Sequence, residues 1–415
     1  MKRFTVPYGE RNLLVEIDER NIADIIGMPK INVSRDDTTL AKALRAPLGP
    51  HSLRQFLNGA KELSIVVNDG ARPTRTAWVI DLLEEDIRDK DVHFVVATGA
   101  HPCPNESGLH KIFGTSYRRH GDCITIHDAR EENAHEYTGK TRYGNEVWLS
   151  KLVTGADKIL IIGSIEPHYF AGLTGGRKSL LPGVAAYRTI EQNHSLALHP
   201  GARPLNLDGN PIHEEMVDCI EMFGRERIFG VQMILNSHHD VWRAFAGPID
   251  ETFECAACIA RGIFSTKIKQ RADVVVSVSR PPLDNDLYQT LKAIEHGRLA
   301  LKPGGILIVV SPCSQGLGPV SFSRLFESNI ALDAAAQNAQ TGYRLGDHNA
   351  HNLISLRKQA EIWMVTKIDA SILETLKIEP FGSLQAALRK AISMKGYSTK
   401  ILFLLDANLT VPILI

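Results

Sequence analysis

A segment between positions 163 and 194 contains the residue types that bind phosphates and move protons. It reads GSIEPHYFAGLTGGRKSLLPGVAAYRTIEQNH and follows a strand-like run. Glycines let a backbone approach a ligand closely, and N–H groups in such a turn can cradle a phosphate. A lysine directly after the turn can neutralise a phosphate or act as a covalent amine. The spacing matches neither a Walker A loop nor G-x-G-x-x-G. The candidate residues are His168, Thr174, Gly175, Gly176, Lys178 and His194.

Two earlier strand-like runs end in residues suited to anion binding and proton transfer. In VVNDGARPTRT the run ends at Asp69, and Arg72 follows with a planar guanidinium that can grip a carboxylate or phosphate. Asp69 is placed to orient Arg72 or a substrate hydroxyl, and a helix cap with a local ion pair is the plainer interpretation. In VVATGAHPCP a turn presents His101, which suits proton transfer, although a lone histidine is more often structural.

A fourth strand end, in VSVSRPPLDNDLYQTLKA, precedes a helix that carries Tyr288, Gln289 and Lys292. Gln289 and Lys292 are three residues apart and therefore share a helix face. Asp284 or Asn285 can cap this helix, and a lysine near its positive end can bind an anion. Alone, this pattern is more typical of a solvated helix face.

Short apolar runs that alternate with helical stretches predict an α/β fold with mainly parallel sheets. A basic segment, STKIKQR, precedes a fresh strand–helix series. We therefore expect an N-terminal domain over residues 1–268 and a smaller, Rossmann-like C-terminal domain over residues 269–415. The strand-like runs cover 63–69, 92–99, 158–165, 272–279, 305–311, 361–366 and 400–405.

Composition narrows the class of protein further. The 415 residues include 47 basic and 47 acidic side chains, so no basic excess indicates nucleic acid as a partner. No apolar run approaches the length of a membrane span, and no secretory signal is visible. Six cysteines are few for this length, which favours a reducing cytoplasm. Cys255 and Cys258 are predicted to be buried on a helix, with a redox or metal role as the alternative.

Taken in order, these motifs resemble the lactate racemase family. The resemblance covers roughly residues 10–320, and it implies a two-domain fold with the active site in an interdomain cleft. It also implies a nickel-pincer nucleotide cofactor (pyridinium-3,5-bisthiocarboxylic acid mononucleotide nickel), maturation enzymes that make it, and a small 2-hydroxy acid substrate. The motifs are D-x-x-R-P-T (69–74), T-G-x-H-P (98–102), P-H-x-x-A-G-x-x-G-G-x-K (167–178) with His194, and P-L-D-x-x-x-Y-Q-x-x-K (282–292).

The resemblance also implies residue roles. Lys178 would attach to the thiocarboxyl group of the cofactor, and the sequence leaves open whether the bond is covalent here. His194 would be the nickel ligand, in line with the preference of Ni(II) for imidazole in a planar site. His101 and His168 would be the acid/base pair, needed because the hydroxyl points to opposite sides in the two enantiomers. Asp69, Thr174, Gly175 and Gly176 would lie at the cofactor, and Arg72, Tyr288, Gln289 and Lys292 would bind the substrate.

Three departures from the family pattern, at Arg75, Arg280 and Gln315, suggest a substrate other than lactate. Arg280 adds a cation near the expected cleft, Arg75 replaces an uncharged residue, and Gln315 stands where an acid is expected. We expect a larger or more polar 2-hydroxy acid, such as a dicarboxylate or a sugar acid.

Two other functions fit parts of the pattern. A zinc hydrolase would use His101, His168 and His194 as metal ligands. A non-catalytic carrier of the nickel cofactor would keep Lys178 and His194 but would have no use for the other groups. The racemase hypothesis alone uses all of them.

Overall fold

The computed structural model describes residues 1–29, 31, 33, 38–70, 72–326 and 329–415. Its internal contacts divide the chain into a central unit, residues 30–262, and a terminal unit, residues 1–29 with 263–415. From the sequence we expected one N-terminal domain over residues 1–268. In the structure, the first 29 residues belong to the terminal unit and not to the central unit. They join the terminal unit because β3 (Ile22–Ile26) pairs in parallel with β19 (Ile401–Leu404).

The central unit is built on a six-stranded sheet with the order β13-β12-β9-β4-β5-β6, in which only the edge strand β13 is antiparallel. The inner strands are apolar along nearly their whole length, as expected for strands covered on both faces. The strands are β4 (Glu62–Asn68), β5 (Asp91–Ala97), β6 (Ile124–Ile126), β9 (Lys158–Ser164), β12 (Ile228–Leu235) and β13 (Val241–Pro248).

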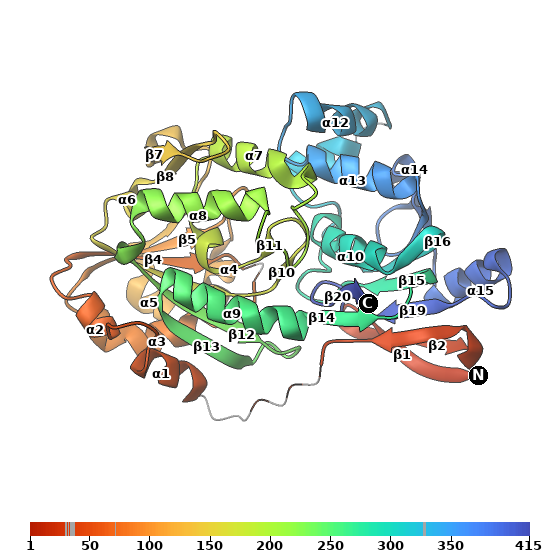
Figure 1. Ribbon diagram of the computed structural model, residues 1–415, viewed down its shortest axis with the longest axis horizontal. Coiled ribbons are helices and arrows are strands. Elements are labelled where there is room, and N and C mark those ends of the chain that lie inside the picture. The colour runs from red at the N-terminus through yellow and green to blue at the C-terminus, as the bar shows by residue number, and fades with distance from the viewer. Residues whose placement is uncertain (30, 32, 34–37, 71, 327–328) are drawn as a thin grey trace. The chain divides into compact units, whose positions relative to one another are not determined.

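Helices cover both faces of this sheet. One core cluster packs α1, α2, α3 and α4 against alternate residues of β4, β5, β9 and β12. α8 and α9 run in front of the sheet (Figure 1), and α9 lies so close to β12 that a Cβ on Gly230 would come within 2.5 Å of Thr252 Oγ1. The helices are α1 (Thr38–Arg45), α2 (Leu53–Phe56), α3 (Thr76–Ile87), α4 (Glu106–Phe113), α5 (Ser116–His120), α6 (Lys151–Thr154), α7 (Tyr187–Ser195), α8 (Pro211–Phe223) and α9 (Ile249–Phe264).

Two small hairpins complete the central unit. β7 (His135–Lys140) pairs with β8 (Glu146–Ser150), and β10 (Pro167–His168) pairs with β11 (Gly172–Leu173). The second hairpin lies within the segment that the sequence singled out, so it positions candidate site residues.

The terminal unit has an all-parallel sheet of order β18-β17-β16-β15-β19-β3. One core cluster packs α10, α13 and α14 on one face, and another packs α15 and the β1–β2 hairpin on the other. The strands are β1 (Lys2–Tyr8), β2 (Arg11–Ile17), β14 (Ser265–Ile268), β15 (Ala272–Val278), β16 (Leu301–Val310), β17 (Glu361–Val365), β18 (Glu379–Pro380) and β20 (Val411–Leu414). The helices are α10 (Leu287–Leu299), α11 (Val320–Ser323), α12 (Asn329–Thr341), α13 (Asp347–Arg357), α14 (Ala370–Thr375) and α15 (Leu384–Lys395).

The cysteines of α9 correct one expectation. Cys255 and Cys258 lie on a helix, as predicted, but both are exposed rather than buried. The buried face of this helix is formed by Phe253, Ala256 and Ala260 instead.

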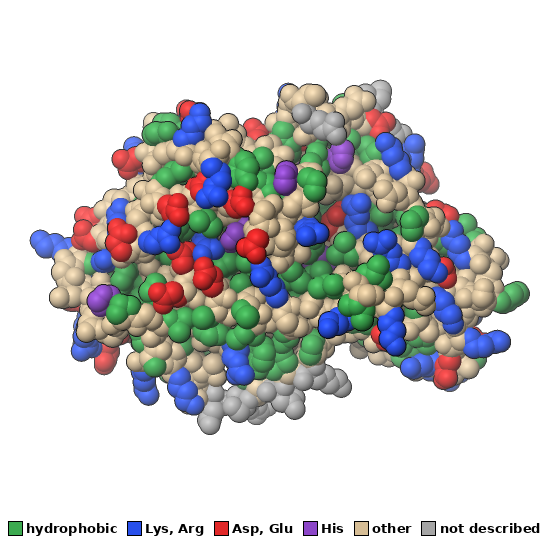
Figure 2. Space-filling model, in the orientation of Figure 1, with side chains coloured by type: hydrophobic (Ala, Val, Ile, Leu, Met, Phe, Trp, Pro, Cys, Tyr) green, Lys and Arg blue, Asp and Glu red, His purple; other side chains and the backbone are tan. Residues whose placement is uncertain are grey.

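The surface carries both signs of charge. Basic and acidic side chains intermingle over the face seen in Figure 2 rather than forming a field of one sign. Across the described residues, every helix is too short or too polar to cross a bilayer.

Candidate functional site

Asp69 and His101 come together at the carboxyl ends of the neighbouring strands β4 and β5. Asp69 Oδ2 lies 2.8 Å from His101 Nδ1, and the side chains are 12% and 34% exposed. The sequence suggested Arg72 or a hydroxyl as the partner of Asp69, and the structure adds His101. An imidazole whose Nδ1–H is held by a carboxylate has a fixed tautomer and is oriented for proton transfer through Nε2.

Arg72 forms a buried ion pair that the sequence did not indicate. Its Nη1 lies 2.6 Å from Glu166 Oε2, and the two side chains are only 11% and 8% exposed. Glu166 lies two residues after the end of β9, and Thr174 fixes its backbone. The Glu166 amide donates to Thr174 Oγ1 at 2.9 Å, and that hydroxyl donates to Ser164 O at 2.9 Å. An acidic residue at the end of a buried strand was the available signal for Glu166.

Lys178 lies on a 3-10 turn, Gly176–Ser179, beside these charges. Among the described residues, its amine makes no hydrogen bond or ion pair. Burial and the nearby positive charge of Arg72 lower its pKa to about 7, while Asp69 acts in the opposite direction. A substantial share of this amine is therefore neutral, and nucleophilic, near pH 7.

The two glycines before Lys178 are required by packing. Gly175 and Gly176 have φ of 79° and 51°. A Cβ on Gly175 would lie 2.5 Å from Ile165 Cδ1, and one on Gly176 would lie 2.6 Å from Phe253 Cδ2. Gln232 on β12 accepts the Gly176 N–H at 2.9 Å. Packing and this hydrogen bond therefore account for both glycines, and the phosphate contact that the sequence indicated stays a prediction.

His168 and His194 both contact one phenylalanine. The Phe170 ring meets the His168 ring edge-on at 4.5 Å and the His194 ring at 5.0 Å between centroids. The two imidazoles are 6% and 8% exposed. His168 ends the short strand β10, two residues after Glu166, and His194 lies in the last turn of α7.

The remaining predicted residues belong to the terminal unit. Lys292 Nζ donates to Gln289 Oε1 at 2.8 Å, so the two share a helix face as expected. The cap of this helix is Asp286, which accepts the Gln289 N–H at 2.7 Å, rather than Asp284 or Asn285. The Tyr288 ring packs edge-on against Phe322.

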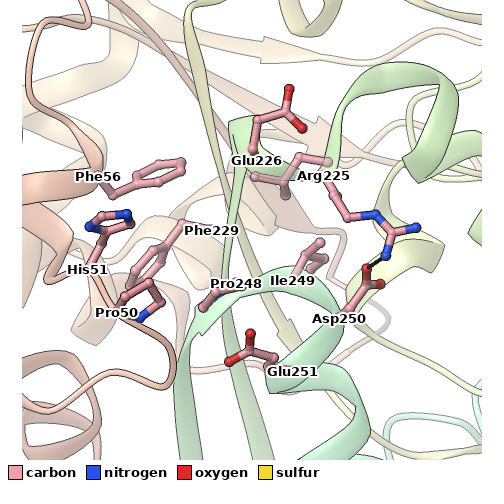
Figure 3. Close-up of a pocket in the computed structure, with 11 residues that line it drawn as sticks. Pro50, His51, Phe56, Arg225, Glu226, Phe229, Pro248, Ile249, Asp250 and Glu251 are labelled. Atoms are coloured by element: carbon pink, nitrogen blue, oxygen red, sulfur yellow. Dashed lines mark ion pairs between the residues drawn. The ribbon is translucent and has the colours of Figure 1, made fainter.

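A pocket of about 410 Å³ lies elsewhere in the central unit (Figure 3). None of the predicted site residues lines it, and its walls are mainly apolar. Asp250 at its edge pairs with Arg225 at 3.0 Å and with Arg177 at 2.6 Å, so the residue before Lys178 is anchored to this pocket.

The described residues offer no support for the zinc alternative. Within the part of the chain that the structure describes, no three His, Cys, Asp or Glu side chains are grouped so that they could hold a metal ion.

Comparison with known proteins decides the family. The family models for the lactate racemase N-terminal domain and C-terminal domain match residues 8–204 and 267–411. A lactate racemase from Thermoanaerobacterium thermosaccharolyticum is 31% identical over 339 residues, which are 79% of each chain. This chain belongs to the lactate racemase family. A second lactate racemase, from Lactiplantibacillus plantarum, is 25% identical over 98% of each chain.

Solved structures agree with the fold of a lactate racemase. The lactate racemase apoprotein from T. thermosaccharolyticum superimposes with a TM-score of 0.90 at 25% identity, covering 99% of this chain and 100% of the other. A Thermotoga maritima protein, with a TM-score of 0.65 and 16% identity over 88% and 96% of the two chains, shares the fold. The predicted family, the mainly parallel α/β fold and the assignment to the isomerases are confirmed.

Proposed function

We propose that the chain inverts the C2 centre of a 2-hydroxy acid with the help of a nickel-pincer nucleotide. The single observation that carries this proposal is the convergence of three groups at the strand ends of the central unit. These are the Asp69–His101 pair, the buried amine of Lys178 with its lowered pKa, and the Arg72–Glu166 pair. Together they supply an oriented base, a nucleophilic amine and a cation in a chain of the lactate racemase family.

The residues present fit the proposed cofactor. Lys178, with a pKa of about 7, is suited to form a bond with a thiocarboxyl group. His194 would contribute an imidazole nitrogen to nickel, a donor that this metal accepts. The Gly175–Gly176 turn, with Thr174 and Asp69 beside it, would lie against the rest of the nucleotide. When bound, the cofactor supplies an acceptor for the hydrogen of C2 as hydride, which avoids a carbanion.

The side chains of this chain handle the proton and the orientation. His101, held by Asp69, takes the hydroxyl proton of one enantiomer, and His168 serves the opposite side. The keto acid formed between the two half-reactions is planar and accepts the hydrogen on either face. Two bases are needed because a single imidazole reaches only one side of the reacting carbon.

Cations hold the carboxylate of the substrate. Arg72 keeps donors beyond the Nη1 that Glu166 engages, so it can still bind an oxyanion. In the terminal unit, Gln289 and Lys292 supply further donors and Tyr288 lies beside them.

The test uses holoenzyme produced together with the cofactor maturation enzymes. We expect His101→Ala and His168→Ala to abolish racemisation while nickel content is kept, and His194→Ala to lose nickel. Racemisation in D₂O should retain the original hydrogen at C2 if it moves as hydride. Full turnover in either catalytic variant, or deuterium at C2, would contradict the scheme.

A further inference from the structure

The strand order of the terminal unit identifies where a ligand binds on its sheet. From β15 the chain proceeds outward through β16, β17 and β18, and then returns to place β19 on the other side of β15. In open parallel sheets, ligands bind outside the carboxyl ends of the strands at such a reversal. Arg280 follows β15 and Asn408 follows β19, so both residues lie at this point.

Only one of the three departures in the sequence leaves a cation available for a ligand. Arg75 donates to His239 O at 2.9 Å and lies 3.6 Å from Asp240, so its guanidinium is engaged. Gln315 is exposed. Arg280 is half-buried, and in the described part of the chain its guanidinium makes no hydrogen bond or ion pair. A half-buried cation without a counter-ion is costly unless a ligand supplies one.

Asn408 adds a second donor without a partner. Its Oδ1 accepts the backbone N–H of Arg280 at 2.9 Å, which fixes the orientation of the amide. Its Nδ2 is buried and has no hydrogen-bond partner in the described structure, and the residue is only 2% exposed. A buried donor of this kind costs about 1–3 kcal/mol unless it is satisfied.

The acidic side chain that senses the charge of Arg280 does not form an ion pair with it. Asp284 is close enough to sense the charge of Arg280, but within the described residues the two side chains form no ion pair. The Asp284 side chain is buried, at 2% exposure. The guanidinium and the Asn408 amide are therefore left to a ligand that accepts hydrogen bonds and carries negative charge.

We propose that Arg280 and Asn408 form a subsite for a second carboxylate on the substrate, so that this enzyme prefers 2-hydroxy dicarboxylic acids. This inference rests on the proposed function, in which Gln289 and Lys292 bind the carboxylate next to the reacting carbon. Arg280 opens the connection that leads to the helix carrying those two residues. A guanidinium fork matches a carboxylate with two parallel hydrogen bonds. A sugar acid, whose hydroxyls also donate, would leave the charge of Arg280 unbalanced.

The experiment compares holoenzyme on lactate, 2-hydroxysuccinate, 2-hydroxyglutarate and gluconate. We expect kcat/KM for a dicarboxylate to exceed that for lactate by about 10- to 100-fold, the range set by one charge-assisted contact. Arg280→Gln should remove this advantage, mainly by raising KM for the dicarboxylate. Its kcat/KM for lactate should stay within about twofold of the wild-type value. Arg280→Lys keeps the charge but loses the two parallel donors of the guanidinium. Its kcat/KM for the dicarboxylate should lie between the values of the wild type and of Arg280→Gln.

Two controls separate binding from folding. Arg389→Gln replaces an exposed arginine on α15 of the same unit. It should leave kcat/KM unchanged for both lactate and the dicarboxylate. Calorimetric titration with succinate, which lacks the reacting hydroxyl, should show binding to the wild type and about 10-fold weaker binding to Arg280→Gln. Equal melting temperatures of the two proteins would confirm that folding is intact.

Two results overturn the inference. One is a wild-type enzyme that racemises lactate or gluconate better than either dicarboxylate. The other is an Arg280→Gln variant that loses lactate and dicarboxylate activity equally. An enzyme that inverts none of these acids would refute the proposed function itself, and this outcome is distinct from the other two.

Discussion

The two sheets of this protein end in opposite electrostatic arrangements. At the carboxyl ends of β4, β5 and β9, charged side chains are matched in pairs: His101 with Asp69 and Arg72 with Glu166. At the carboxyl ends of β15 and β19, Lys292 is held by a neutral amide and Arg280 by nothing in the described chain. Paired groups keep a fixed orientation, which proton transfer needs, whereas a cation without a counter-ion in the described chain, such as Arg280, attracts a negatively charged ligand. This difference fits the proposal that the first edge carries the proton transfer and the second edge selects the substrate.

The largest expected effect comes from breaking the orientation of the base. Asp69→Asn keeps the size of the side chain but removes the charge that fixes the His101 tautomer. We expect kcat to fall by about 10²- to 10⁴-fold, the usual range for general acid–base catalysis, while KM changes little. Gln289→Ala, at the other edge, should instead raise KM. Steady-state kinetics with each enantiomer as substrate would measure both effects. Equal losses of kcat in Asp69→Asn and Gln289→Ala would contradict the difference between the two sheet edges.

A second prediction concerns the buried ion pair. Glu166→Ala leaves the Arg72 guanidinium buried without its carboxylate, which should cost about 3–5 kcal/mol of unfolding free energy. Glu379→Ala, which removes the exposed partner of Lys390, should cost no more than about 1 kcal/mol. Denaturant unfolding measures both. If both variants lost no more than about 1 kcal/mol of unfolding free energy, the Arg72–Glu166 pair would be exposed to solvent and not buried.

A third prediction tests the amine between the paired groups. Acylation of Lys178 in the apoprotein, followed by mass spectrometry across pH, should show a midpoint at about 7. Arg72→Gln should raise this midpoint, because the charge of Arg72 helps to lower the pKa. A midpoint near that of ordinary lysines in both proteins would argue against an activated amine.

The smallest effect is acid sensitivity, which should be shared by both units. Burial lowers the pKa of His127 in the central unit, and of His296 in the terminal unit, to about 4 from the usual 6.5. The unfolded chain therefore binds more protons between these values, so unfolding free energy should fall as pH drops from 6.5 to 4. Denaturation at several pH values checks this. His127→Gln and His296→Asn should each flatten the slope, and an unchanged slope in both would contradict the assignment.

Local signals in the sequence predicted much of the fold. The apolar runs at 63–69, 158–165 and 272–279 became β4, β9 and β15, since burial on both faces requires such runs. The exposure of Cys255 and Cys258 was missed because a helix of mixed pattern gives no clear indication of which face is buried.

The partners of site residues could not be predicted in the same way. Candidate residues followed from strand ends, but Glu166 with Arg72 and His101 with Asp69 are separated by 94 and 32 positions. Such contacts depend on which strands become neighbours, and the residues alone do not fix that order. The pairing of β3 with β19 escaped prediction for the same reason.

That last pairing has a consequence for how the molecule is made. Ile22–Ile26 is synthesised before the central unit, whereas its partner Ile401–Leu404 is synthesised after it. Residues 30–262 form one contiguous unit and can close their core in the meantime. β3 cannot pair until β19 has been synthesised, so deletion of Ile22–Ile26 should disturb the sheet of the terminal unit, whose other strands are translated after the central unit.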